Sequence, residues 1–207
     1  MKRALDQLSD EEVLRCMLAG DSSSFAELYR RWQSGVYRFA LRMAGSGPLA
    51  EDITQEVFLT LMRDGAQYAG RGKFAAYILT IARHAMLRRL QRERRFVALE
   101  KDESEEDFDG SNLIDRSSVG PDPLAELVRE ETIEAVRQAV IGLPLHYREV
   151  VLLCHLHDLS YAEAAEVIGC DIGTVCSRLY RARAMLARRL ESLRSESEPK
   201  ANMRIAR

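Results

Sequence analysis

Apolar residues recur at helical spacing along most of the chain, and the pattern is clearest in residues 160–190, SYAEAAEVIGCDIGTVCSRLYRARAMLARRL. Ser160 and Glu163 form a capping box that opens a helix, and Gly169 ends it. Asp171 can cap a second helix. The apolar residues of that helix lie on one face, namely Val175, Leu179, Ala182 and Leu186. The segment therefore predicts two helices joined by a tight turn.

Polar residues line the opposite face of the second predicted helix: Thr174, Ser177, Arg178 and Arg181. Six arginines and a single acid, Glu191, lie between residues 174 and 194. A short helix, a small-residue turn and a basic second helix are typical of a helix-turn-helix, whose second helix enters the DNA major groove. A helical hairpin with a solvated basic face is the alternative, and the excess of arginine favours nucleic acid.

Six further helices are predicted by the same spacing and by start and stop signals. They cover about 9–20, 21–44, 48–65, 74–95, 123–141 and 145–157. No strand pattern and no internal repeat is present in the sequence, so we expect an all-α fold. The helices divide into two small domains, 1–96 and 123–190, joined by a segment at 97–122 and followed by a polar tail at 191–207.

Charge is distributed unevenly along the chain, although the formal net charge is only −2. Residues 1–96 hold sixteen basic and eleven acidic residues, whereas residues 97–122 hold two and nine. The acidic segment is rich in Ser and Gly and lacks periodicity, which predicts a flexible linker. Hydrophobic residues make up 46% of the chain, enough for real cores. Two basic faces separated by an acidic linker suit a polyanionic partner.

Metal, redox and catalytic chemistry are weakly represented. Cys154, His155, His157, Cys170 and Cys176 lie close in sequence, and a metal or redox role competes with a role as small buried hydrophobes, which we favour. No phosphate loop, nucleophile elbow or acid–base pair is found, so we expect no enzyme, no metal and no cofactor. The sequence has no signal-peptide pattern and no membrane-length apolar run, so we expect no membrane insertion and a cytoplasmic location.

Five motifs in order resemble the bacterial sigma-70 family, and specifically its extracytoplasmic-function (ECF) group. They are FAELYRRW, AEDITQEVF, KFAAYILTIARH, LPLHYREVVLL and SYAEAAEVIGCDIGTVCSRLYRARAML. The resemblance covers about residues 20–95 and 124–190. It implies a bundle like sigma region 2 in the first domain and a helix-turn-helix like sigma region 4 in the second.

The resemblance also implies protein partners. AEDITQEVF is similar to the family segment that grips the β′ clamp helices of core RNA polymerase, which places Asp52, Gln55 and Glu56 on the polymerase. A solvated acidic face is the alternative reading of these residues. The family further implies a contact with the polymerase β flap and an anti-sigma protein that holds the factor inactive.

Residues 64–73 and the helix that follows resemble the part of the family that opens the promoter and holds the non-template strand. The residues implied to touch downstream promoter DNA are Tyr68, Lys73, Phe74, Arg83, Arg88, Arg89 and Arg92. The aromatic rings would stack on bases, and the arginines would follow phosphates. Tyr77 and His84 depart from the tryptophan and asparagine that are usual in the family, and we expect Tyr77 to pack in the core.

The helix-turn-helix is implied to read the upstream promoter box. The residues on or beside the reading face are Thr174, Cys176, Ser177, Arg178, Tyr180 and Arg181. Cys176 stands where the family usually has Lys or Arg, so we expect weaker and less salt-dependent binding. Arg178 either contacts DNA or pairs with Glu166 of the preceding helix.

The function expected from these patterns is that of a transcription initiation factor. It would bind core RNA polymerase, direct it to a bipartite promoter and assist promoter opening. The alternative is a stand-alone helix-turn-helix regulator that binds an operator as a dimer. A third possibility is a protein-interaction module without DNA binding, and the two arginine-rich helices argue against it.

Overall fold

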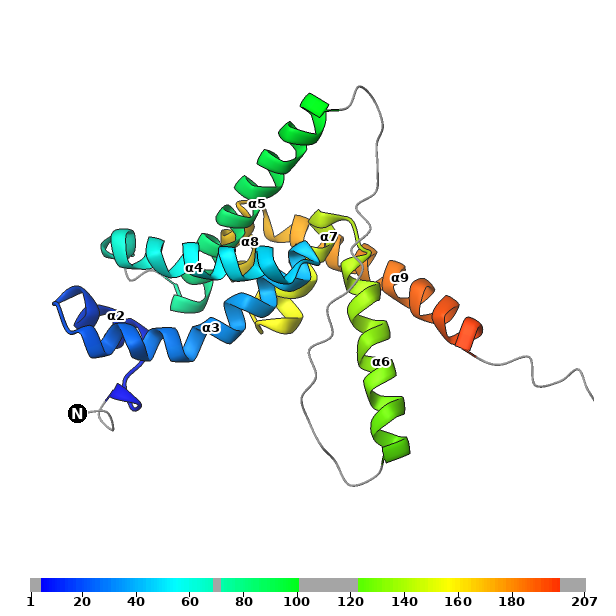
Figure 1. Ribbon diagram of the computed structural model, residues 1–207, viewed down its shortest axis with the longest axis horizontal. Helices are drawn as coiled ribbons and strands as arrows, with labels where there is room; N and C mark the ends of the chain where they lie inside the picture. The colour runs from blue at the N-terminus through cyan, green and yellow to red at the C-terminus, as the bar shows by residue number, and fades with distance from the viewer. Residues whose placement is uncertain (1–4, 69–71, 101–122, 198–207) are drawn as a thin grey trace, which may run out of the picture.

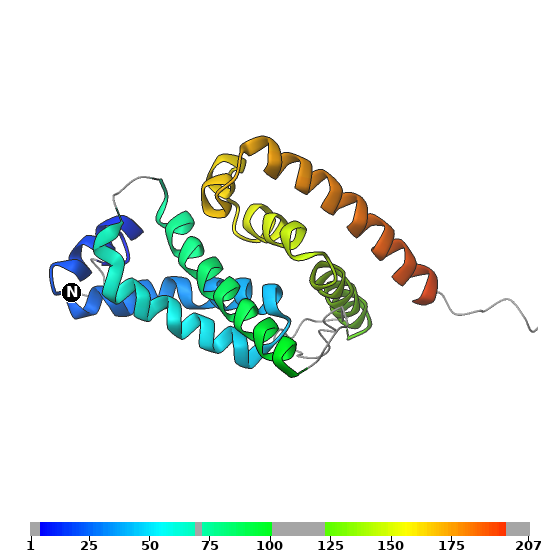
Figure 2. The same ribbon diagram turned by 90° about the horizontal axis from the view of Figure 1, so that it is seen from above.

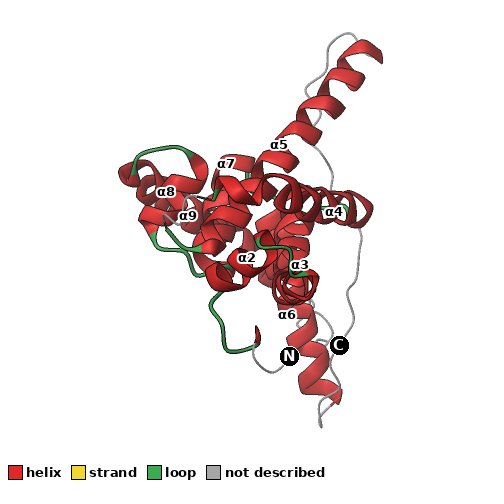
Figure 3. Ribbon diagram, turned by 90° about the vertical axis from the view of Figure 1, so that its left-hand side faces the viewer, coloured by secondary structure: helices red, strands yellow, loops and turns green. Residues whose placement is uncertain are grey.

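A computed structural model describes residues 5–68, 72–100 and 123–197, with side chains placed for 5–68, 72–92 and 132–192. Every regular element in these ranges is helical, as Figure 3 shows. The α-helices are α2 (Asp10–Leu18), α3 (Ser22–Ala44), α4 (Gly47–Asp64), α5 (Phe74–Glu100), α6 (Pro123–Ile141), α7 (Leu145–Val151), α8 (Tyr161–Ile168) and α9 (Ile172–Ser197). A 3₁₀ turn, η1 (Gly65–Gln67), follows α4, and a π-helical segment, η2 (Leu152–Leu156), follows α7. The all-α prediction is confirmed.

Helices α2 to α5 form the first unit (Figure 1). The predicted inner stripe of α4 is completely buried, since Ala50, Ile53, Val57 and Leu61 are all 0% exposed. Gly45 ends α3 in the left-handed conformation, with a φ of 71°, which a residue with a side chain rarely adopts. Pro48 then lies in the first turn of α4, where its missing N–H costs nothing.

Helices α6 to α9 form the second unit, which contains the predicted helix-turn-helix. Both cap predictions for α8 are confirmed, because Ser160 and Glu163 form a complete capping box and Gly169 ends the helix with a φ of 76°. Val175 and Leu179 of α9 are buried against α8 and α7. The turn and the packing together fix the direction of α9 relative to α8.

The two units lie side by side (Figure 2), and their buried residues form one apolar core. Helix α5 contacts α8, and α3 contacts α6, α7 and η2. The rings of Phe39 and His157 meet edge-on with centroids 5.8 Å apart, and Arg148 of α7 donates a hydrogen bond to the carbonyl of Met43 at 2.5 Å. Two helical domains are thus present as predicted, but in this structure they are joined by packing as well as by the chain.

Three helix boundaries differ from the sequence-based predictions. Helix α5 continues to Glu100 and α9 to Ser197, because neither extension contains a glycine or proline to end it. The helix predicted at 145–157 changes at Val151 to π-helical hydrogen bonding, with the His157 amide donating to the Leu152 carbonyl at 3.2 Å. The rest of the predicted linker, 101–122, and the end of the tail, 198–207, lie outside the described residues. Among the described helices, none has both the length and the apolar character of a membrane span.

Candidate polymerase and promoter interface

The outer face of α9 presents the predicted upstream-box residues. Cys176, Ser177, Tyr180 and Arg181 are exposed, and the Tyr180 side chain is 78% exposed, more than any other large hydrophobic residue in the described part of the chain. The Ser177 hydroxyl donates to the Thr174 carbonyl at 3.0 Å, so it is partly engaged by its own helix. The structure therefore brings these side chains onto one continuous outer surface of the helix.

The two arginines of this face have different surroundings. Arg178 is half-buried and pairs with Glu149 of α7 at 3.2 Å, so its internal partner is Glu149 and not Glu166. Arg181 makes no ion pair or side-chain hydrogen bond with any residue in the described part of the chain. Arg181 is therefore the arginine that is available to a DNA base edge without first leaving a protein partner.

Cations predicted to touch downstream DNA are paired with carboxylates from both units. Lys73 lies 3.1 Å from Glu163 of α8, and Arg83 lies 2.9 Å from Glu149. The Glu149 side chain is only 5% exposed. It pairs with both Arg83 of α5 and Arg178 of α9, and so joins the two helices. A buried carboxylate requires such partners, because an unpaired charge in a dry site is strongly unfavourable. Glu149 is a site residue that the sequence analysis missed; its one signal is an acid inside the apolar run YREVVLL.

Two of the remaining predicted arginines of α5 pair with carboxylates of α4. Arg88 pairs with Glu56 at 2.7 Å, and Arg89 lies 3.6 Å from Asp52 and 3.8 Å from Glu56. Arg92 is exposed. Predicted polymerase-binding carboxylates and predicted DNA-binding arginines therefore form one charged surface between two helices.

The predicted base-stacking residues form an aromatic cluster at the start of α5. Phe74 is 1% exposed and lies under Trp32 and Tyr68, with ring centroids 5.7 and 6.2 Å away. Its ring therefore belongs to the core here and is not presented to a base. Tyr68 is half-buried, and its hydroxyl donates to the Gly72 carbonyl at 2.8 Å. Tyr77 packs against the core and donates to the Asp64 carbonyl at 3.2 Å, which confirms the expected packing role.

The exposed flank of α4 carries the predicted polymerase-binding residues. Asp52 and Gln55 are exposed and Glu56 is half-buried. The same flank continues into Leu59 and Met62, which are 66% and 56% exposed. The sequence analysis missed these two residues, because an apolar residue on a helix is ordinarily assigned to the core. A groove of about 380 Å³ runs beside this flank between α3 and α4, with Tyr29, Tyr37, Glu51 and Gln55 among its lining residues.

The cysteines and histidines do not form a metal site within the described residues. All four cysteines are free thiols. Cys154 is buried, and burial raises the pKa of its thiol, which fits the small-hydrophobe interpretation. Burial, with a smaller contribution from Arg38 and Arg42, lowers the pKa of His157 to about 4. His157 is therefore a neutral packing residue at neutral pH.

Comparisons with known proteins agree with the division into two units. Residues 28–96 match the family described as Sigma-70 region 2, and residues 133–186 match Sigma-70, region 4. The chain is similar to the ECF RNA polymerase sigma factor SigE of Mycolicibacterium smegmatis, with 32% identity over 86% of this chain and 66% of the relative. It is also similar to the ECF RNA polymerase sigma factor SigW of Bacillus subtilis, with 27% identity over 84% of this chain and 92% of the relative.

Solved structures share the fold. The sigma factor RpoE of Bartonella quintana, solved in complex with the anti-sigma factor NepR, matches 81% of this chain and 96% of its own with a TM-score of 0.66 and 24% identity. CnrH, solved in complex with the cytosolic domain of CnrY, matches 88% of this chain and 97% of its own with a TM-score of 0.62 and 22% identity.

Proposed function

Because the chain belongs to the ECF group of the sigma-70 family, we propose that it binds core RNA polymerase, directs it to a bipartite promoter and assists promoter opening. The observation that carries the proposal concerns α9, the second helix of the helix-turn-helix. Its outer face leaves Ser177 and Arg181 exposed, while α8 is fully capped at both ends. A helix of this kind reads base edges in the major groove. In this proposal the second unit reads the upstream box and the first unit the downstream box.

The flank of α4 is the proposed polymerase-binding face. Asp52, Gln55 and Glu56 would pair with basic side chains of the β′ clamp helices, and Leu59 and Met62 would supply apolar contact beside them. An interface needs such an apolar centre, because exposed ion pairs alone contribute little free energy. We place a second contact, with the β flap, on the region 4 unit.

Promoter DNA would compete with carboxylates of the protein. Lys73, Arg83 and Arg178 are each paired with Glu163 or Glu149, which would have to give up these cations for full contact with phosphates or bases. Arg92 and Arg181 are exposed and could contact DNA directly. The proposal therefore includes a rearrangement in which the two units separate so that phosphates replace the carboxylates.

An anti-sigma protein is the further partner in this proposal. RpoE and CnrH, which share the fold, were each solved with such a partner or with a cytosolic domain of a second protein. The proposal excludes the stand-alone regulator, since DNA recognition by this chain would require core polymerase.

Transcription in vitro with core RNA polymerase tests the proposal. We expect transcription from a genomic fragment library only when the chain and the core enzyme are both present. Leu59→Asp should weaken core binding at least tenfold, because it places a charge in the apolar part of the α4 flank. Leu18→Asp is the matched control, because Leu18 is an exposed leucine, 44% exposed, that belongs to α2 and not to α4. Equal binding by both variants would remove α4 from the interface, and sequence-specific DNA binding without core polymerase would favour the stand-alone regulator.

A further inference from the structure

The start of α5 lacks a cap from its own neighbourhood. The Lys73 carbonyl accepts hydrogen bonds from the amides of Ala76 and Tyr77, so Lys73 occupies the N-cap position. A lysine side chain has no acceptor for the free amides of the first turn. Gly72 before it, with a φ of 74°, has no side chain at all. The neighbouring residues 72 and 73 therefore offer the first amides of α5 no side-chain acceptor.

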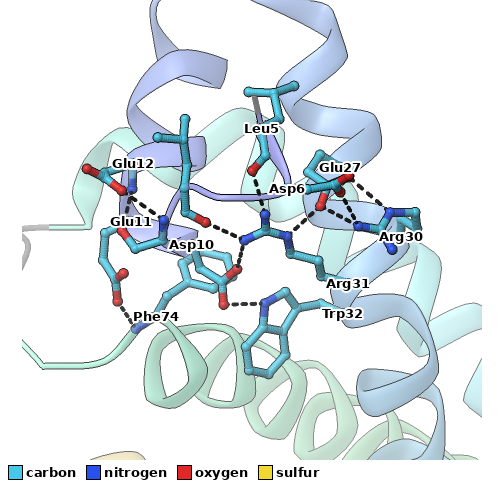
Figure 4. A network of polar contacts seen from close by, with 12 residues as sticks. Leu5, Asp6, Asp10, Glu11, Glu12, Glu27, Arg30, Arg31, Trp32 and Phe74 are labelled. Atoms are coloured by element: carbon cyan, nitrogen blue, oxygen red, sulfur yellow. Dashed lines mark hydrogen bonds and ion pairs between the residues drawn. The ribbon is translucent and has the colours of Figure 1, made fainter. Parts of the chain in front are cut away.

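Glu11 of α2 supplies that acceptor from 63 residues away. Its carboxylate Oε1 accepts the hydrogen bond from the Phe74 amide at 3.0 Å, as Figure 4 shows. This bond is the main cause that lowers the pKa of Glu11, so the carboxylate is charged at neutral pH. A charged acceptor also lies favourably against the positive end of the helix dipole.

Helix α2 is fixed firmly enough to act as a reference for α5. Asp10 accepts a hydrogen bond from the indole of Trp32 at 2.9 Å and pairs with Arg31 at 2.8 Å. Arg31 also donates to the backbone carbonyl of Leu8 and, as Figure 4 shows, to that of Leu5. Because these bonds hold α2 on α3, Glu11 cannot follow a shift of α5, and the bond resists that shift.

The position of Phe74 determines that of residues proposed to contact the downstream promoter. Lys73 is its immediate neighbour, with a side chain that is 67% exposed. Tyr68 stacks edge-on against Phe74 and is tied to the Gly72 carbonyl. Both side chains therefore depend on where the first turn of α5 lies.

We propose that Glu11 is a positioning residue for promoter opening, because its bond to the Phe74 amide fixes the first turn of α5 and with it Lys73 and Tyr68. This inference rests on the proposed function. Glu11 itself touches neither DNA nor polymerase in this proposal. Its loss should impair the opening of a duplex promoter and spare core binding.

The test compares Glu11→Ala with Glu12→Ala in the reconstituted holoenzyme. Glu12 lies in the same turn and caps α2 through Ser9, so both variants lose one carboxylate from α2 but only one uncaps α5. We expect Glu11→Ala to lower permanganate reactivity of promoter thymines about three- to tenfold, the loss typical of one helix cap. A pre-melted promoter should restore transcription, and Glu11→Gln, which keeps an acceptor oxygen, should recover part of the opening.

Two results would overturn the inference. One is normal opening by Glu11→Ala, and the other is an equal defect in Glu12→Ala or on the pre-melted template, which would indicate a general loss of folding. Amide hydrogen exchange at Phe74 provides a readout that needs no polymerase, and it should accelerate in Glu11→Ala alone. If the wild-type chain binds no core polymerase, the proposed function fails and the role in opening fails with it, while Phe74 exchange still reports whether Glu11 caps α5.

Discussion

Side chains on the same face of a helix differ in their availability to a partner, because some of them already pair with other residues of the protein. Arg178 and Arg181 are one turn apart on α9, and the sequence pattern leaves open whether Arg178 contacts DNA or pairs within the protein. Arg178 pairs with the buried carboxylate of Glu149, whereas Arg181 is exposed. A structural and a DNA-binding contribution can therefore be separated by substituting each arginine in turn.

Arg181→Ala should reduce transcription from a bipartite promoter by the equivalent of about 1–3 kcal/mol, the contribution of one good base or phosphate contact. Its free energy of unfolding should change by no more than about 0.5 kcal/mol, because the side chain is exposed. Arg178→Ala should lower the free energy of unfolding by about 1–3 kcal/mol, because it removes one of the two partners of Glu149. Urea unfolding and in vitro transcription provide the two measurements. If the two variants had the same stability, the Glu149 pair would contribute nothing.

Helices α2 and α8 begin where a short local motif captures their free amides. Helices α2 and α8 each open with a serine and a glutamate that complete a capping box. Helix α8 has only eight residues, so it is too short to be stable alone and depends on its cap and on packing. The orientation of α9 depends on its packing against α8. The Ser160 cap therefore also supports the helix that is proposed to bind the upstream promoter box.

Ser160→Ala should lower the free energy of unfolding by about 0.5–2 kcal/mol, because the Glu163 amide in the first turn of α8 loses its acceptor, the Ser160 hydroxyl. Ser177→Ala is the matched control, since the same hydroxyl is removed from an exposed position inside α9 and alanine favours a helix there. Urea unfolding followed by circular dichroism compares the two variants. An equal loss of stability in both would show that the Ser160 cap has no special role.

The whole molecule is held together by contacts between its two units. His157, at the end of η2, packs against Phe39 of α3, and its Nε2 atom is buried without a hydrogen-bond partner among the described residues. Arg38 and Arg42 of α3 lie near it, and the acid Asp158 counters them. Protonation of His157 would therefore place a charge in the interface between the units.

This arrangement predicts a pH-dependent stability. The pKa of His157 is about 4 in the folded chain, below the usual value of 6.5, so between these values the unfolded chain binds the proton and the folded chain does not. The contribution of neutral His157 to the free energy of unfolding is present above about pH 6.5 and is lost as the pH drops toward 4. Between pH 7.5 and 5.5 the wild type should lose about 1 kcal/mol more than His157→Phe, which keeps a flat ring and cannot titrate. Urea unfolding at both pH values measures the difference, and parallel curves would contradict the assignment.

Local patterns in the sequence determined the helices, their order and the buried face of each. Caps such as Ser160 and Gly169, and the stripe from Val175 to Ala182, act within a few residues, so spacing alone predicts them. The same patterns located the helix-turn-helix and indicated the resemblance to the sigma-70 family. The comparisons confirm that resemblance. They also placed Asp52 and Arg181 on exposed flanks of their helices.

Only the tertiary structure decided which distant groups meet. Glu149 joins Arg83 and Arg178 across 66 and 29 residues, and Glu11 caps α5 across 63. Burial of Phe74 and exposure of Leu59 likewise depend on which helix lies against each face. Helical periodicity is a property of one segment, whereas an ion pair or a remote cap requires the packing of several segments. The charged contacts that would compete with DNA therefore appear only once the two units are assembled.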